Sequence, residues 1–140
     1  MNPINARTVR FWAWVDSAVT VALALPPLAE RFVALLYTVN GWTGGVSEAP
    51  TFEPIHLLFV CLLGALVSVW VIARLLRPLP LFGLIDGWGR AWVAAILLWF
   101  VCARDAPPVI LFFVFTEGAG AVAQLWAGYR LARGAPESAE

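Results

Sequence analysis

A carboxylate, Glu117, stands inside an otherwise apolar run, FFVFTEGAGAVAQLW at residues 112–126. If this run is helical, Gln124 lies seven residues or two turns further on, and therefore on the same face as Glu117. Gly120 and Gly128 share that face, and such a stripe of small and polar residues predicts close contact with another helix. A carboxylate there must be sheltered from hydrocarbon, protonated, or both. We therefore expect either a hydrogen bond that holds helices together or a site that binds a proton or a ligand.

Three more charged residues fall in or beside apolar segments. Asp86 and Arg90 are spaced four apart, which predicts a pair on one helix face, with Asp86 capping the helix N-terminus. Asp16 has no partner within its own segment, and depth counted along oppositely running helices brings it to the level of Gln124. Arg90 or Arg10 could reach across to Asp16.

The single histidine, His56, follows Glu53 by one helical turn at the start of an apolar segment. We expect an interfacial side chain at the outer end of a helix. Two alternatives remain, a proton acceptor at the mouth of a path toward Glu117 and, with weaker support, an axial haem ligand. The residues at spacing four from His56 predict a second helix–helix seam: Val60, Gly64 and Ser68.

The composition is that of a membrane protein. The chain has 140 residues, of which 61% are hydrophobic and only 13% charged, whereas soluble domains carry about a quarter charged residues. Too little polar surface is available to cover a globule in water. The formal net charge of zero gives no reason to expect a nucleic-acid partner. One histidine and two cysteines within apolar segments cannot complete an ordinary zinc site, so we expect neither a metal nor a cofactor.

Four apolar segments are long enough to cross a bilayer, each within the range of roughly 17–25 residues. Arginines followed by prolines in RLLRPLP, and the proline pair in RDAPP, end the second and third segments. The length of the chain allows one domain. We therefore predict an all-α fold, a single bundle of four transmembrane helices at about 11–28, 55–73, 87–103 and 109–128.

The connection between the first two segments has its own helical pattern. ALPPLAERFVALLYTVNGW, residues 24–42, predicts a short helix lying in the outer membrane interface or a kinked extension of the first span. TGGVSEAPT then predicts a flexible loop. At the other end of the chain, residues 134–140 are predicted to be a disordered tail.

The arginines predict the orientation, because cytoplasmic loops of membrane proteins are enriched in basic residues. Two arginines, Arg31 and Arg104, lie on one side of the predicted bundle. Seven lie on the other side, which should therefore be cytoplasmic together with both termini: Arg7, Arg10, Arg74, Arg77, Arg90, Arg130 and Arg133.

The run HLLFVCLLGALVSVWVIARLLRP, followed by IDGWGR and FTEGAGAVAQL, resembles the small four-helix bacterial inner-membrane proteins called DoxX-like or BphX-like. The resemblance covers most of the chain. It implies a multi-pass helical bundle of the bacterial inner (cytoplasmic) membrane, often an accessory or partner subunit, and carries over no active site.

These residues support three hypotheses for function. In the first, the chain is a non-catalytic membrane protein that binds an apolar or lipid-like molecule, or a partner helix, in the seam around Glu117. In the second, it is a proton-coupled small-molecule transporter in which Glu117 exchanges the proton, with His56 as the outer access group and Asp16 and Arg90 as inner ones. In the third, Glu117 is the acid or base of a membrane enzyme, although no second catalytic group is apparent. Expected partners are the lipid bilayer, an apolar small molecule, and either a second copy of the chain or a membrane partner protein.

Overall fold

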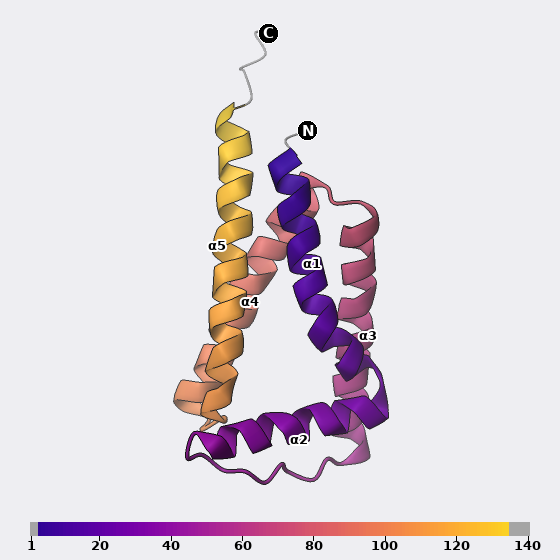
Figure 1. Cartoon of the computed structure of the whole chain (residues 1–140), viewed down its shortest axis with the longest axis vertical. Coiled ribbons are helices and arrows are strands. Elements are labelled where there is room, and N and C mark those ends of the chain that lie inside the picture. The colour runs from indigo at the N-terminus through magenta and orange to yellow at the C-terminus, as the bar shows by residue number, and fades with distance from the viewer. Residues whose placement is uncertain (1–2, 135–140) are drawn as a thin grey trace.

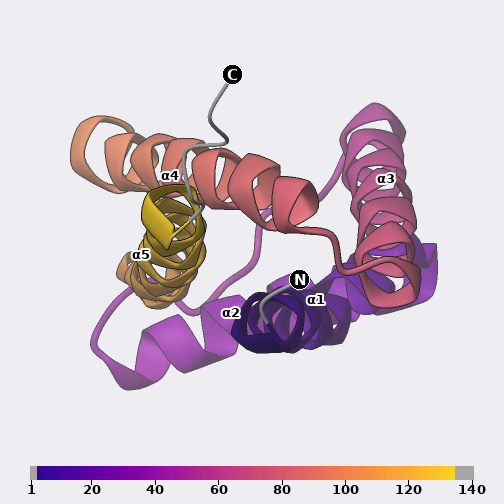
Figure 2. The same ribbon diagram turned by 90° about the horizontal axis from the view of Figure 1, so that it is seen from above.

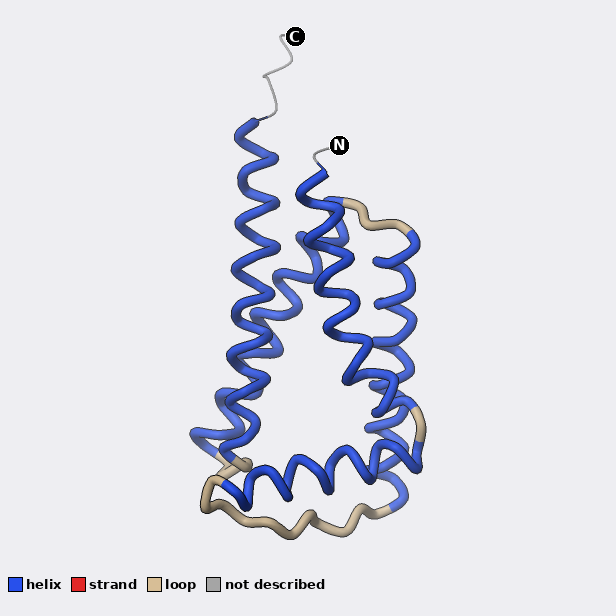
Figure 3. Tube along the Cα trace, viewed as in Figure 1, coloured by secondary structure: helices blue, strands red, loops and turns tan. Residues whose placement is uncertain are grey.

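The computed structural model describes residues 3–134, and all regular structure in this range is helical, as predicted (Figures 1 and 3). The predicted tail lies outside the described residues from 135 onward. Five α-helices and one short 3₁₀ helix follow in the order α1 Pro3–Ala24, α2 Pro26–Trp42, α3 Pro54–Leu76, α4 Pro80–Ala103, η1 Pro108–Ile110 and α5 Leu111–Gly134.

Prolines set where most of these helices begin. A proline at the first helical position has no N–H to leave unpaired, and its fixed φ suits a helix. The prediction of this role for Pro54 is confirmed, and the same role recurs at Pro26, Pro80 and Pro108. Because α4 begins at Pro80, Asp86 lies inside the helix. The prediction that Asp86 caps its N-terminus is therefore wrong, and Leu79 occupies the cap position.

Three helical stretches are each long and apolar enough to cross a membrane: Pro54–Leu76, Pro80–Ala103 and Pro108–Tyr129. A fourth candidate exists if Ala6–Ala24 and Pro26–Trp42, bent by 112° at Leu25, are counted as one span. The predicted first segment, 11–28, thus runs across a sharp break. Beyond the break, α2 is a separate helix that crosses one end of the molecule (Figure 1).

Asn40 fixes the far end of α2. Its buried side chain accepts a hydrogen bond from the backbone N–H of Val109 at 3.1 Å and donates one to the carbonyl of Val46 at 3.0 Å. The amide therefore joins α2 both to the loop that comes after it and to η1, which leads into α5.

The long helices form two closely packed pairs, α1 with α3 and α4 with α5. Helix α1 also contacts α4 and α5, but less extensively. Both ends of the chain lie at the same end of the molecule as the α3–α4 connection, whereas α2 closes the opposite end (Figures 1 and 2). The mutual position of the two pairs therefore depends on the side chains that lie between them.

The interior is unusually polar for so apolar a chain. The buried hydrophobic residues are few and small or medium-sized: Val9, Ala13, Ala29, Val71 and Ala121. The buried polar residues are Thr20, Asn40, Arg74, Asp86, Arg90 and Gln124, while large hydrophobic side chains are exposed on all five α-helices. A water-soluble domain buries such side chains and exposes its charges. The arrangement suits a surface covered by lipid.

Gly64 allows the close approach of α3 to α1. A Cβ atom added there would lie 2.5 Å from the backbone N of Ala24, and backbone cannot move aside as a flexible side chain can. We predict that Gly64→Ala lowers the free energy of unfolding by about 1–3 kcal/mol. The midpoint of thermal unfolding in detergent should fall accordingly.

Gly89 in α4 supplies the matched control, because a Cβ there would meet nothing within 4 Å. Gly89→Ala should unfold at the wild-type temperature or slightly above it, since alanine favours helix more than glycine. Equal midpoints for the two variants, measured by circular dichroism, would contradict the packing described for Gly64.

Candidate functional site

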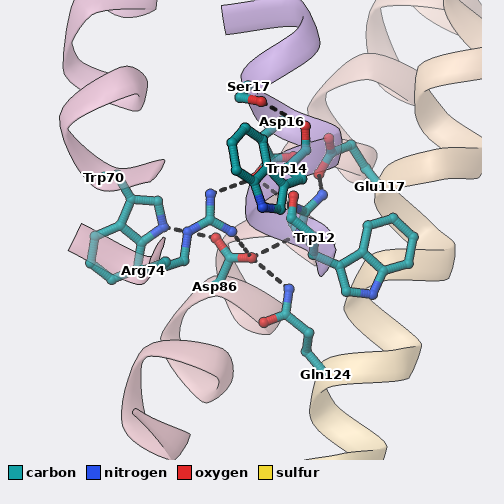
Figure 4. Close-up of polar contacts among 10 residues, drawn as sticks. Trp12, Trp14, Asp16, Ser17, Trp70, Arg74, Asp86, Glu117 and Gln124 are labelled. Atoms are coloured by element: carbon teal, nitrogen blue, oxygen red, sulfur yellow. Dashed lines mark hydrogen bonds and ion pairs between the residues drawn. The ribbon is translucent and has the colours of Figure 1, made fainter. Parts of the chain in front are cut away.

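A cluster of charged side chains lies between the two helix pairs, and we call it the charge network (Figure 4). Each of the four long helices contributes to it. Its members are Asp16 of α1, Arg74 of α3, Asp86 and Arg90 of α4, and Glu117 and Gln124 of α5.

Asp86 is the centre of the charge network. One carboxylate oxygen, Oδ1, accepts a hydrogen bond from the indole of Trp70 at 2.8 Å. The other, Oδ2, accepts from Arg74 at 2.6 Å, from Arg90 at 2.9 Å and from Gln124 at 2.5 Å. Four donors, two of them cationic, stabilise the ionised form of a carboxylate that is only 8% exposed.

Arg90 links three helices. Its guanidinium donates to Asp86 on its own helix, to Asp16 on α1 at 2.5 Å and to Glu117 on α5 at 3.0 Å. It also reaches the backbone carbonyl of Trp12 at 3.3 Å, and it lies 5.0 Å from the centroid of that residue's ring. The planar fork of an arginine can make all these contacts at once, which a lysine could not.

Arg74 reaches the charge network from α3 and is fully buried. It donates to Asp86 and, at 2.5 Å, to Asp16, so that Asp16 receives both guanidiniums. Its charge also lies 5.7 Å from the ring centroid of Trp70. Arg74 thereby ties α3 to α4, two helices that are not otherwise closely packed.

The local sequence presents these groups in pairs four residues apart, and residues at this spacing share a helix face. The pairs are Trp12 and Asp16 on α1, Trp70 and Arg74 on α3, and Asp86 and Arg90 on α4. Three helices therefore turn one polar face each toward a common centre.

Gly120 gives Arg90 the room it occupies against α5. A Cβ atom at Gly120 would lie 2.8 Å from Cδ of Arg90 and 3.1 Å from the ring of Trp12. The small and polar stripe predicted on this helix thus faces α4 and α1, with Gln124 almost completely buried and Glu117 partly buried.

Five of the six site residues predicted from the sequence come together in the charge network: Asp16, Asp86, Arg90, Glu117 and Gln124. His56 does not join them. It is exposed in the first turn of α3, and 18 residues separate it from Arg74, about 27 Å along a helix.

Arg74 and the two tryptophans beside the charge network were not predicted as site residues. Arg74 was assigned to the cytoplasmic flank because it stands near Arg77 and the prolines after it. Its spacing of four from Trp70, at the end of an apolar helix, is the signal that could have found it. Trp12 lies near the end of a predicted span, where tryptophans commonly serve as anchors at the level of the lipid headgroups.

No protein-family model, no curated protein and no solved structure matches the chain. The resemblance to DoxX-like proteins therefore stays a prediction, and the function must be inferred from the geometry of the charge network. Among residues 3–134, no group of three or more histidine, cysteine, aspartate or glutamate side chains is placed to hold a metal ion.

Removing one buried guanidinium should destabilise the fold strongly. We predict that Arg74→Met, which keeps an unbranched side chain but removes the guanidinium, lowers the free energy of unfolding by about 3–5 kcal/mol, because it leaves buried carboxylates uncompensated. Arg77→Met is the matched control, since Arg77 is exposed three residues later. Thermal unfolding in detergent measures both. Similar midpoints for the two variants would contradict a structural role for the charge network.

Proposed function

We propose that this chain is an integral membrane protein with four spans, formed by α1, α3, α4 and α5, and with both termini in the cytoplasm. Support comes from the apolar surface, the candidate spans and the common end at which both termini lie. The bend at Leu25 lets α2 lie along the outer membrane surface, where the polar side chains of this helix can face water and its apolar side chains can face lipid.

The arginine asymmetry supports this orientation even after correction. Arg74 and Arg90 are buried in the charge network and cannot mark a side of the membrane. Five arginines remain toward the end with the termini, against Arg31 and Arg104 at the other: Arg7, Arg10, Arg77, Arg130 and Arg133.

We propose further that the chain works as a proton-coupled small-molecule transporter, in which the charge network binds the exchangeable proton. One observation carries this proposal. The charge network contains three carboxylates, Asp16, Asp86 and Glu117, but two guanidiniums, so it has a net charge of −1 when all five groups are ionised. An uncompensated charge inside a membrane is unfavourable by several kcal/mol, and one bound proton removes it.

Glu117 is the carboxylate that takes the proton. Asp86 accepts four hydrogen bonds and Asp16 accepts from two guanidiniums, whereas within the described part of the chain Glu117 pairs with Arg90 alone, at 3.0 Å. Its side chain is also the most exposed of the three, at 22% against 13% for Asp16 and 8% for Asp86. Glu117 thus has the fewest hydrogen bonds and ion pairs to lose on protonation, and its exposure gives an incoming proton access. The negative charges of Asp16 and Asp86 nearby favour its protonated form.

The position of the charge network explains how a proton could drive movement. Its ion pairs join α1–α3 to α4–α5 across a thin apolar interior, and Arg90 contacts Asp16 and Glu117 on opposite sides of that junction. The same guanidinium pairs with Glu117 on α5 and with Asp16 on α1, so gain or loss of the proton on Glu117 changes how strongly Arg90 is held toward α5 relative to α1. The two pairs thus provide two bodies whose relative arrangement can follow the state of Glu117.

Binding of a lipid-like ligand or a partner helix in the seam around Glu117 has less support. The side chains of Arg90 and Trp12 already fill the space in front of Gly120, within 2.8 and 3.1 Å of an added Cβ. The seam is a contact between helices of the same chain.

The proton can be observed directly by infrared spectroscopy of the purified protein in lipid. We predict a carbonyl band of a protonated carboxylic acid at neutral pH that is lost in Glu117→Gln, a variant that keeps the shape but cannot ionise. Glu48→Gln, in the exposed loop after α2, should keep the band. A band that survives Glu117→Gln would contradict the assignment of the proton.

Transport itself can be tested with proteoliposomes that contain a pH-sensitive dye. When a panel of small cations, anions and neutral solutes is added outside, at least one solute should change the internal pH with the wild-type protein and not with Glu117→Gln. If no solute in a broad panel moves protons, although the acid band is present, proton binding stands and transport does not.

The topology predicts opposite labelling at two positions. With Cys61 and Cys102 replaced by alanine, Ser47→Cys in the loop after α2 should react with an impermeant maleimide in intact cells. Ser138→Cys, near the C-terminus, should react only after lysis. The reverse pattern would contradict the proposed orientation.

A further inference from the structure

Two buried polar atoms of the charge network have no hydrogen-bond partner among the residues that the structure describes, Nε of Arg74 and Oε1 of Gln124. Both side chains are almost completely buried. A buried polar group without a partner is unfavourable by about 1–3 kcal/mol, and native proteins usually satisfy such groups with ordered water.

The two atoms have complementary chemistry and belong to side chains that meet. Arg74 and Gln124 both donate to the same oxygen of Asp86, at 2.6 and 2.5 Å. Nε of Arg74 offers a donor and Oε1 of Gln124 an acceptor. Oδ1 of Asp86, which receives one bond from Trp70, has a further lone pair. A water molecule needs two to four such partners and little space.

We propose that the charge network binds ordered water at Arg74 and Gln124, beside Asp86. The water accepts a hydrogen bond from Nε of Arg74 and donates to Oε1 of Gln124 or Oδ1 of Asp86. This binding site stands on the unpaired atoms alone and does not depend on transport.

The position of this water gives it a role that does rest on the proposed function. Gln124 lies two turns beyond Glu117 toward the C-terminus, and Arg74 lies in the last turn of α3, near the exposed Arg77. Both residues are thus on the side of Glu117 that faces the end with the termini. This water forms one part of the path by which the proton of Glu117 exchanges with the cytoplasm.

Radiolytic hydroxyl labelling with mass spectrometry detects buried water, because radicals formed from bound water oxidise the side chains beside it. In the wild-type protein Trp70, which hydrogen-bonds to Asp86, should be oxidised, and this oxidation should be lost in Gln124→Met. Trp88 is the reference, since it is exposed on α4 outside the charge network and should be labelled equally in both proteins.

Absence of Trp70 oxidation in the wild type, or equal oxidation in the variant, would overturn the water site. If Gln124→Met does not fold, Arg74→Lys, which keeps the charge but lacks the Nε donor, replaces it in the same comparison. The proton-transfer role is tested separately, by the rate at which the Glu117 acid band shifts when the protein is moved to D₂O. Gln124→Met should slow this shift, and an unchanged rate would overturn the role. A missing acid band in the wild type would instead overturn the proposed function and leave the water site standing.

Discussion

The structure depends on the ion pairs that two buried arginines make between α1–α3 and α4–α5. The apolar residues buried in the interior are few and mostly small, and they cannot hold four long helices together by themselves. Arg74 and Arg90 each contact Asp16 on one side of the junction and Asp86 on the other. In a surrounding of low dielectric constant these ion pairs are strong, and their loss would leave charges that neither water nor a partner can stabilise. The apolar exterior suits lipid, and the charged interior supplies the contacts between helices that the few buried apolar residues do not.

Sequence spacing predicted much of this site because helical periodicity is a local property. The stripe from Glu117 to Gln124 and the pair Asp86–Arg90 follow from residues on a single helix. Arg90 was also a candidate to reach Asp16, and the structure places it there. Arg74 was missed because an arginine beside a helix end is ambiguous in sequence, and only the position of the neighbouring helices decides whether it turns inward. The early start of α4 at Pro80 escaped prediction for a related reason, since a glycine-rich amphipathic stretch does not stand out in an average of hydrophobicity.

Three candidate spans, Pro54–Leu76, Pro80–Ala103 and Pro108–Tyr129, were predictable from composition and proline placement, whereas the sharp bend between α1 and α2 was left open. Length alone cannot distinguish one kinked span from a span followed by a surface helix. His56 illustrates a further limit. Its place at the mouth of a helix suggested an access group, but the distance along α3 separates it from the charge network. A titratable residue becomes part of a site only if its position along the helix places it at the same level as the other members.

The odd number of charges in the charge network links its structural role to its proposed chemistry. A balanced set of ion pairs would serve only to join helices, whereas we propose that the third carboxylate binds a proton that can be gained and lost. The most direct test of this claim changes the balance without touching Glu117. Asp16→Asn keeps a hydrogen-bond acceptor on α1 but removes one negative charge, so that Glu117 can ionise and still leave the charge network neutral. Infrared spectra at neutral pH should then lose the carboxylic acid band, although Glu117 is intact. A band that persists unchanged in Asp16→Asn would contradict the account.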